Sequence, residues 1–179
     1  ALVFSFFGFS TVFYLHWKPF AFDIAPVLIK EKIGIAEPAD LKMIGKICNT
    51  LKRASCSLAA YEKLLALDPN DTMILANLAI NYAENGQYEL AEKKFLELLQ
   101  KGEGSVESYY WYSKTLYALG KKEEALTAGY HAIEIHPGLV DMLDLQTQNL
   151  LSLSRPEEAL SMIQGVIRTF PSAASYFKA

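Results

Sequence analysis

Residues 81–95 read NYAENGQYELAEKKF, and residues 116–137 read LYALGKKEEALTAGYHAIEIHP. Gly86 and Gly120 lie 34 residues apart, and so do Ala91 and Ala125. Each glycine stands between two stretches of helical periodicity, which predicts a turn between two helices. These two stretches therefore indicate an internal repeat with a period of 34 residues.

The period divides much of the chain into four units without an insertion, namely 38–71, 72–105, 106–139 and 140–173. Small residues recur at the eighth and twentieth positions, where they allow two helices to approach closely. A proline near the end of three units forbids continuation of the second helix. Each unit is thus predicted to be a helix, a turn and a second helix. The eighth and twentieth positions are Gly45, Ala79, Ser113 and Thr147, and Ser57, Ala91, Ala125 and Ala159.

This pattern resembles the tetratricopeptide repeat family over residues 38–173. The resemblance implies an all-α, right-handed solenoid whose first helices line a concave groove that binds a peptide or a partner helix. Three positions depart from the family's pattern, because Gln146 replaces an apolar residue, Gly129 replaces an aromatic one and Glu103 replaces a proline.

The family's groove positions, carried over onto this sequence, fall on all four first helices. They form an aromatic and aliphatic floor with a few cations, a surface suited to apolar anchors with oriented polar contacts. The alternative for the aromatic residues is that they simply pack between neighbouring units. The predicted groove residues are Lys42, Lys46, Asn49, Met73, Asn77, Ile80, Tyr110, Trp111, Lys114, Tyr117, Asp144 and Gln148.

Family members that bind chaperone tails hold a terminal carboxylate with Lys and Asn side chains. Here Lys42 and Asn77 match that clamp, but Lys46 replaces its first Asn, and Glu107 and Trp111 replace its last two cations. We therefore expect no specific binding of chaperone tails.

The ends of the chain differ from the repeats. Residues 1–22 carry Lys18 as their only charge and begin with the uncharged run ALVFSFFGFSTVFYL. That run is shorter than the roughly 20 apolar residues of a membrane-spanning helix, but His16 and Trp17 nearly close the gap. We interpret residues 1–22 as a membrane anchor, and the alternative is an arm buried in protein. Residues 23–37 are predicted to be a linker or short helix, and residues 174–179 to begin a further helix or cap.

The charged residues indicate no nucleic-acid partner, because 20 acidic and 17 basic residues are mixed along the chain. His16, His131 and His136 lack metal-ligand spacing, and neither a phosphate-binding loop nor a nucleophile elbow is present. We expect no enzyme activity, cofactor or metal. Cys48 and Cys56 lie on either side of the first predicted turn, where a disulfide can form, although we favour two buried thiols.

Together these observations predict a non-catalytic, membrane-associated scaffold that recruits a protein or peptide partner. One alternative is an accessory repeat domain of a larger membrane enzyme. Another is a soluble repeat protein whose apolar N-terminus fills a groove or joins two copies, and the C-terminal end offers a second surface for self-association. Which side of the membrane the repeats would occupy stays open.

Overall fold

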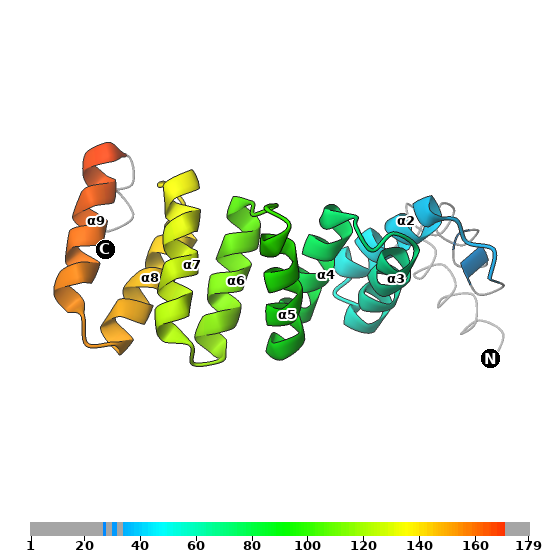
Figure 1. Cartoon of the computed structure of the whole chain (residues 1–179), viewed down its shortest axis with the longest axis horizontal. Helices are drawn as coiled ribbons and strands as arrows, with labels where there is room; N and C mark the ends of the chain where they lie inside the picture. The colour runs from blue at the N-terminus through cyan, green and yellow to red at the C-terminus, as the bar shows by residue number, and fades with distance from the viewer. Residues whose placement is uncertain (1–26, 28–29, 32–33, 171–179) are drawn as a thin grey trace, which may run out of the picture. The chain divides into compact units, whose positions relative to one another are not determined.

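The computed structural model describes residues 27, 30, 31 and 34–170. The predicted membrane anchor, the predicted cap and most of the predicted linker lie outside these residues. The described part of the chain contains eight α-helices and no strand (Figure 1). The helices are α2 Pro38–Thr50, α3 Ala54–Leu67, α4 Thr72–Glu84, α5 Tyr88–Gln100, α6 Val106–Ala118, α7 Lys122–Ile135, α8 Val140–Ser152 and α9 Pro156–Thr169.

The chain divides into two compact units, Ala1–Asp68 and Pro69–Ala179, called here the N-terminal unit and the C-terminal unit. The N-terminal unit contains α2 packed on α3. In the C-terminal unit each helix from α4 to α9 contacts the next one along the chain. In addition α6 contacts both α4 and α8, so these three first helices form a row.

Each first helix begins at the first position of a predicted period, at Pro38, Thr72, Val106 and Val140. The local reasons differ between helices. Pro38 occupies the first turn of α2, where its missing N–H costs nothing. The Asp71 side chain accepts a hydrogen bond from the Ile74 N–H and so caps α4.

The turn inside each pair contains one residue with positive φ, and these four residues are again 34 positions apart. Gly86 and Gly120 adopt φ of 71° and 77°. Lys52 and Ser154 adopt φ of 54° and 60° at the equivalent positions. The predicted glycine turns are therefore present, and the other two pairs make the same turn without glycine.

Most of the small residues are buried, as expected for positions between paired helices. Ser57, Ala91 and Ala125 are fully buried, and Ala159 is nearly so. In the third pair the Ser113 hydroxyl donates a 2.7 Å hydrogen bond to the Ala125 carbonyl oxygen. A larger side chain at these positions would force the helices apart.

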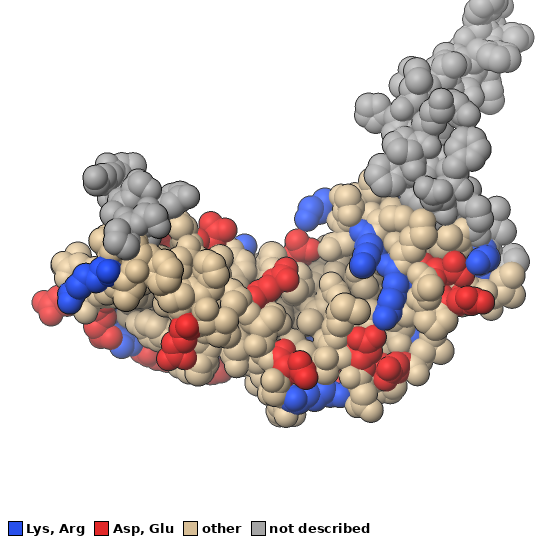
Figure 2. Space-filling model, turned by 90° about the horizontal axis from the view of Figure 1, so that it is seen from above, with Lys and Arg blue, Asp and Glu red and all other residues tan. Residues whose placement is uncertain are grey.

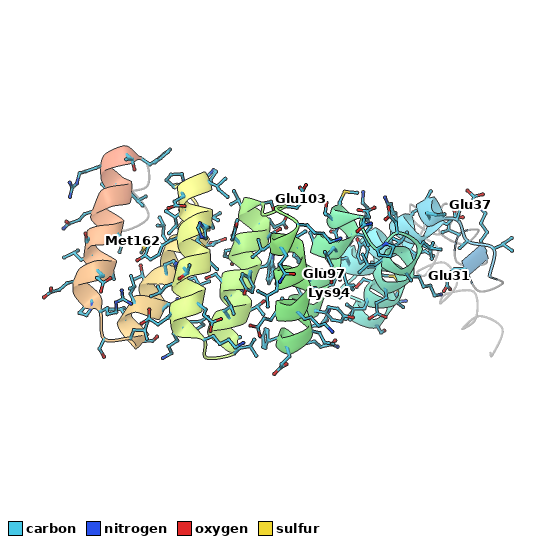
Figure 3. All side chains as sticks on the ribbon, in the orientation of Figure 1. Glu31, Glu37, Lys94, Glu97, Glu103 and Met162 are labelled. Atoms are coloured by element: carbon cyan, nitrogen blue, oxygen red, sulfur yellow. A yellow bond between two sulfur atoms is a disulfide. The ribbon has the colours of Figure 1, made fainter. Side chains whose placement is uncertain are left out.

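Apolar residues from successive helices of the C-terminal unit complete its core. Leu126 of α7, Leu150 of α8 and Ala159 of α9 form one buried cluster. Met162 of α9 packs against this cluster from its edge (Figure 3). The cluster therefore joins the third helix pair to the fourth.

Two of the departures from the repeat pattern compensate for each other. The Gln146 side chain is fully buried, and its Nε2 donates a 2.7 Å hydrogen bond to the Leu126 carbonyl oxygen. A Cβ atom added to Gly129 would come within 2.2 Å of that Nε2 atom. Gly129 is therefore the residue that leaves room for the polar side chain on the next helix.

We expect Gly129→Ala to lower the free energy of unfolding by about 2 kcal/mol, because the new methyl group collides with buried Gln146. Gly165→Ala is the matched control, because a Cβ atom at helical Gly165 meets nothing within 4 Å. That control should raise stability by about 0.5 to 1 kcal/mol through helix propensity. Urea denaturation followed by circular dichroism measures both, and equal effects of the two variants would contradict this account.

The cysteines correct our sequence-based interpretation. Instead of two thiols, the N-terminal unit contains a Cys48–Cys56 disulfide that joins α2 to α3. The turn between these helices brings the two Cα atoms to 5.7 Å, a separation that a disulfide spans without backbone movement. Cys48 also packs in a buried cluster with Val27, Ile44 and Ala60.

Reduction of this disulfide should lower the stability of the N-terminal unit by about 2.5 kcal/mol, because the crosslink restricts the unfolded chain. Urea denaturation with and without dithiothreitol measures the effect. A double Cys48→Ala, Cys56→Ala variant is the control, since the reductant should leave its transition unchanged. A wild-type unfolding transition that stays the same when the reductant is added would argue against a structural disulfide.

Candidate partner-binding face

The predicted groove residues divide between the two units. Lys42, Lys46 and Asn49 lie on α2 in the N-terminal unit, separate from the others. The remaining nine lie on the three first helices that form a row in the C-terminal unit, and we call these nine the first-helix face. They are Met73, Asn77 and Ile80 on α4, Tyr110, Trp111, Lys114 and Tyr117 on α6, and Asp144 and Gln148 on α8.

The centre of this face is an aromatic pair on α6. The rings of Tyr110 and Trp111 meet edge to face, with centroids 5.6 Å apart and planes at 76°. One turn further along, the Lys114 Nζ lies 4.9 Å from the centroid of Trp111 and 5.9 Å from that of Tyr110. An ammonium group at this distance is attracted to the electron-rich ring faces.

The aromatic side chains of α6 are neither fully exposed nor fully buried. Tyr110, Trp111 and Tyr117 are each half-buried, whereas Lys114 between them is exposed. Each ring therefore packs against neighbouring residues and also keeps part of its surface uncovered. Packing between units and contact with a partner are both compatible with this exposure, and the assignment of these residues to a groove stays a prediction.

Carboxylates from α8 act electrostatically on the Tyr110 phenol. Burial raises the pKa of Tyr110, and the negative charges of Asp141 and Asp144 raise it further. Gln148 donates a 2.8 Å hydrogen bond from its Nε2 to Asp144. Sequence reasoning missed Asp141, although its position three residues before Asp144 on one helix face is a signal that could have found it.

The asparagine side chains of α4 form hydrogen bonds to the backbone of their own helix. The Asn77 amide donates a 2.7 Å hydrogen bond to the Met73 carbonyl oxygen of its own helix. Asn81 and Asn85 repeat the pattern, donating to the carbonyl oxygens of Asn77 and Asn81. The apolar part of the α4 surface comes from Met73, which is 59% exposed, and half-buried Ile80.

Several charged residues outside this face have structural partners. His131 is exposed, with its ring against Tyr109 and its Nδ1 3.3 Å from Glu134. Arg155 forms ion pairs with Glu123 and Glu158, and its hydrogen bond lowers the pKa of Glu158. Glu123 and Glu158 lie in the first turns of α7 and α9.

The described part of the chain contains no group of three His, Cys, Asp or Glu side chains placed to hold a metal ion. None of its helices is both long and apolar enough to cross a membrane, and residues 1–22 lie outside it. On the surface drawn in Figure 2 acidic and basic side chains are mixed, in keeping with the net charge of −3.

Comparison with known protein families identifies the type of repeat. Residues 60–93, one period of the repeat, match the family model of the tetratricopeptide repeat. The resemblance to the tetratricopeptide repeat family and the all-α solenoid fold are therefore confirmed, while the number of repeats remains a prediction. A search of curated protein sequences finds no match.

Among solved structures, the chain is similar to several of the protein MamA. One MamA crystal structure is 22% identical, with a TM-score of 0.68 over 75% of this chain and 73% of that one. MamA from Desulfovibrio magneticus RS-1 is 17% identical, with a TM-score of 0.69 over 76% of this chain and 77% of that one. At these identities the likeness shows the fold alone. The fold and the family match support a protein-interaction scaffold.

Proposed function

We propose that this protein is a non-catalytic scaffold that binds a segment of a protein partner on its first-helix face. The observation that supports the proposal is the row formed by α4, α6 and α8, whose residues Met73, Tyr110 and Trp111 each keep part of their surface exposed. A row of helices offers an extended surface, and an extended surface suits recognition of a peptide or a helix.

The aromatic pair on α6 supports a specific rather than a diffuse contact. Half-buried Tyr110 and Trp111 are held in one geometry by each other and by Lys114, so little side-chain entropy is lost on binding. Large aromatic residues held in this way carry much of the energy of protein interfaces, and truncation of one typically costs about 2 kcal/mol. We place the centre of the partner contact at this pair.

Tyr110→Ala should therefore weaken capture of partners by the full chain about 30-fold, which corresponds to about 2 kcal/mol. The measurement is a pull-down in which the concentration of the bait is varied and the captured partners are quantified by mass spectrometry. Crosslinking then locates the contact. Tyr88→Ala is the control, because Tyr88 is a half-buried tyrosine at the start of α5, outside the face. Partners that bind both variants as tightly as wild type would show that the face is misassigned.

We also propose that residues 1–22 attach the scaffold to a membrane. The support is the sequence, with a single charge in these residues and fifteen uncharged residues at their start. Such a segment partitions into a bilayer far more readily than into water. The aromatic Trp17 and the neighbouring Lys18 are of the kind found at the membrane interface.

The full chain should float with phosphatidylcholine liposomes on a density gradient. A Phe7→Lys, Val12→Lys variant should stay with the soluble fraction, because each charge in the middle of the apolar run costs about 3 kcal/mol. A Lys93→Ala variant, which leaves residues 1–22 unchanged, is the control and should float like the wild type. Flotation of the doubly charged variant at the wild-type level would exclude insertion of this segment.

A further inference from the structure

The first helices of the C-terminal unit carry an excess of negative charge. Helices α4, α6 and α8 contain one basic residue, Lys114, among their described residues. They contain four acidic residues, which are Glu84, Glu107, Asp141 and Asp144. These three helices therefore contain more acidic than basic residues.

The single cation of this row does not neutralise the carboxylates of α8. The Lys114 ammonium lies over the rings of Trp111 and Tyr110. Among the described residues, neither Asp141 nor Asp144 forms an ion pair with a basic side chain. Burial raises the pKa of the Tyr110 phenol, and the negative charges of both carboxylates raise it further.

Two features describe this part of the face. The aromatic pair holds the Lys114 ammonium of the chain itself, and the rings keep part of their surface exposed for an apolar group. Asp141 and Asp144 are three residues apart on α8, so their side chains project from one helix face about 5 to 6 Å apart. One guanidinium group can contact two carboxylates at that spacing.

We propose that the first-helix face, together with Asp141, binds a partner segment with a lysine or arginine next to an apolar residue. The basic group lies between Asp141 and Asp144, beside the Tyr110 hydroxyl. The apolar side chain packs on the uncovered parts of Tyr110 and Trp111. This inference rests on the proposed function and names the chemistry of the partner.

The same charges act against acidic partners. A carboxylate placed beside Asp141 and Asp144 would meet like charges on α8, and like-charge juxtaposition opposes binding. The only compensation within the row is the Lys114 ammonium. The face therefore discriminates by charge as well as by shape.

The test uses two probes that differ in one side chain, acetyl-Leu-Arg-Leu-amide and acetyl-Leu-Glu-Leu-amide. Each is titrated into the ¹⁵N-labelled full chain in a zwitterionic detergent at low salt, and the Trp111 indole resonance is followed. We expect the arginine peptide to bind at least about fivefold more tightly than the glutamate peptide. The preference should fall as salt is added, because salt screens charges at the surface.

The deciding variant is Asp141→Asn, Asp144→Asn, which keeps the side-chain shapes and should remove the preference for arginine. The matched control is Glu134→Gln, Glu157→Gln, which changes the net charge equally at exposed positions on α7 and α9. The control should keep the preference. Equal binding of the two peptides, absence of any shift with either, or a preference that survives in the aspartate variant would each overturn the inference.

These outcomes are separable from the scaffold function itself. If the pull-down still depends on Tyr110 while the aspartate variant behaves like wild type, the face binds a partner and only its charge preference is wrong. If the pull-down is also insensitive to Tyr110, the proposed function fails with it.

Discussion

The structure depends on how closely the two helices of a pair can approach. Ala91 and Ala125 have no exposed surface, and the helices that carry them pack directly on the first helices before them. Because the contact leaves no room for a larger side chain, the relative position of the two helices is fixed. The bulky residues at the other positions of the repeat then fill the gap between this helix pair and the next one.

The packing within each helix pair also determines which side chains face outward. When the second helix covers one side of α6, the opposite side is left to the neighbouring first helices and to solvent. Tyr110, Trp111 and Lys114 contact one another within one turn of α6 and keep part of their surface exposed. The contact of α6 with α8 then brings the carboxylates of the next repeat to the same aromatic pair. The character of the face is therefore set by pairs of repeats and by no single repeat.

The repeat tolerates local exceptions where a neighbour compensates. Gln146 would be costly in an apolar column, because a buried amide needs a hydrogen-bond partner. The carbonyl of Leu126 supplies one partner, and the absence of a side chain at Gly129 supplies the space. The disulfide between Cys48 and Cys56 is another local solution, since it links the two helices of the N-terminal unit covalently.

The amino-acid sequence by itself determined the class of fold, because a 34-residue period of small and bulky residues admits few other packings. The first helices begin at the first position of each period, and the small residues other than Thr147 are buried. It also placed Tyr110, Trp111 and Lys114 within one turn of the same helix, since helical spacing is a local property. Only the tertiary structure decided which residues of different repeats meet. The approach of Asp141 to Tyr110, the fit of Gln146 to Gly129 and the pairing of the cysteines each depend on distances between helices, which no local pattern encodes.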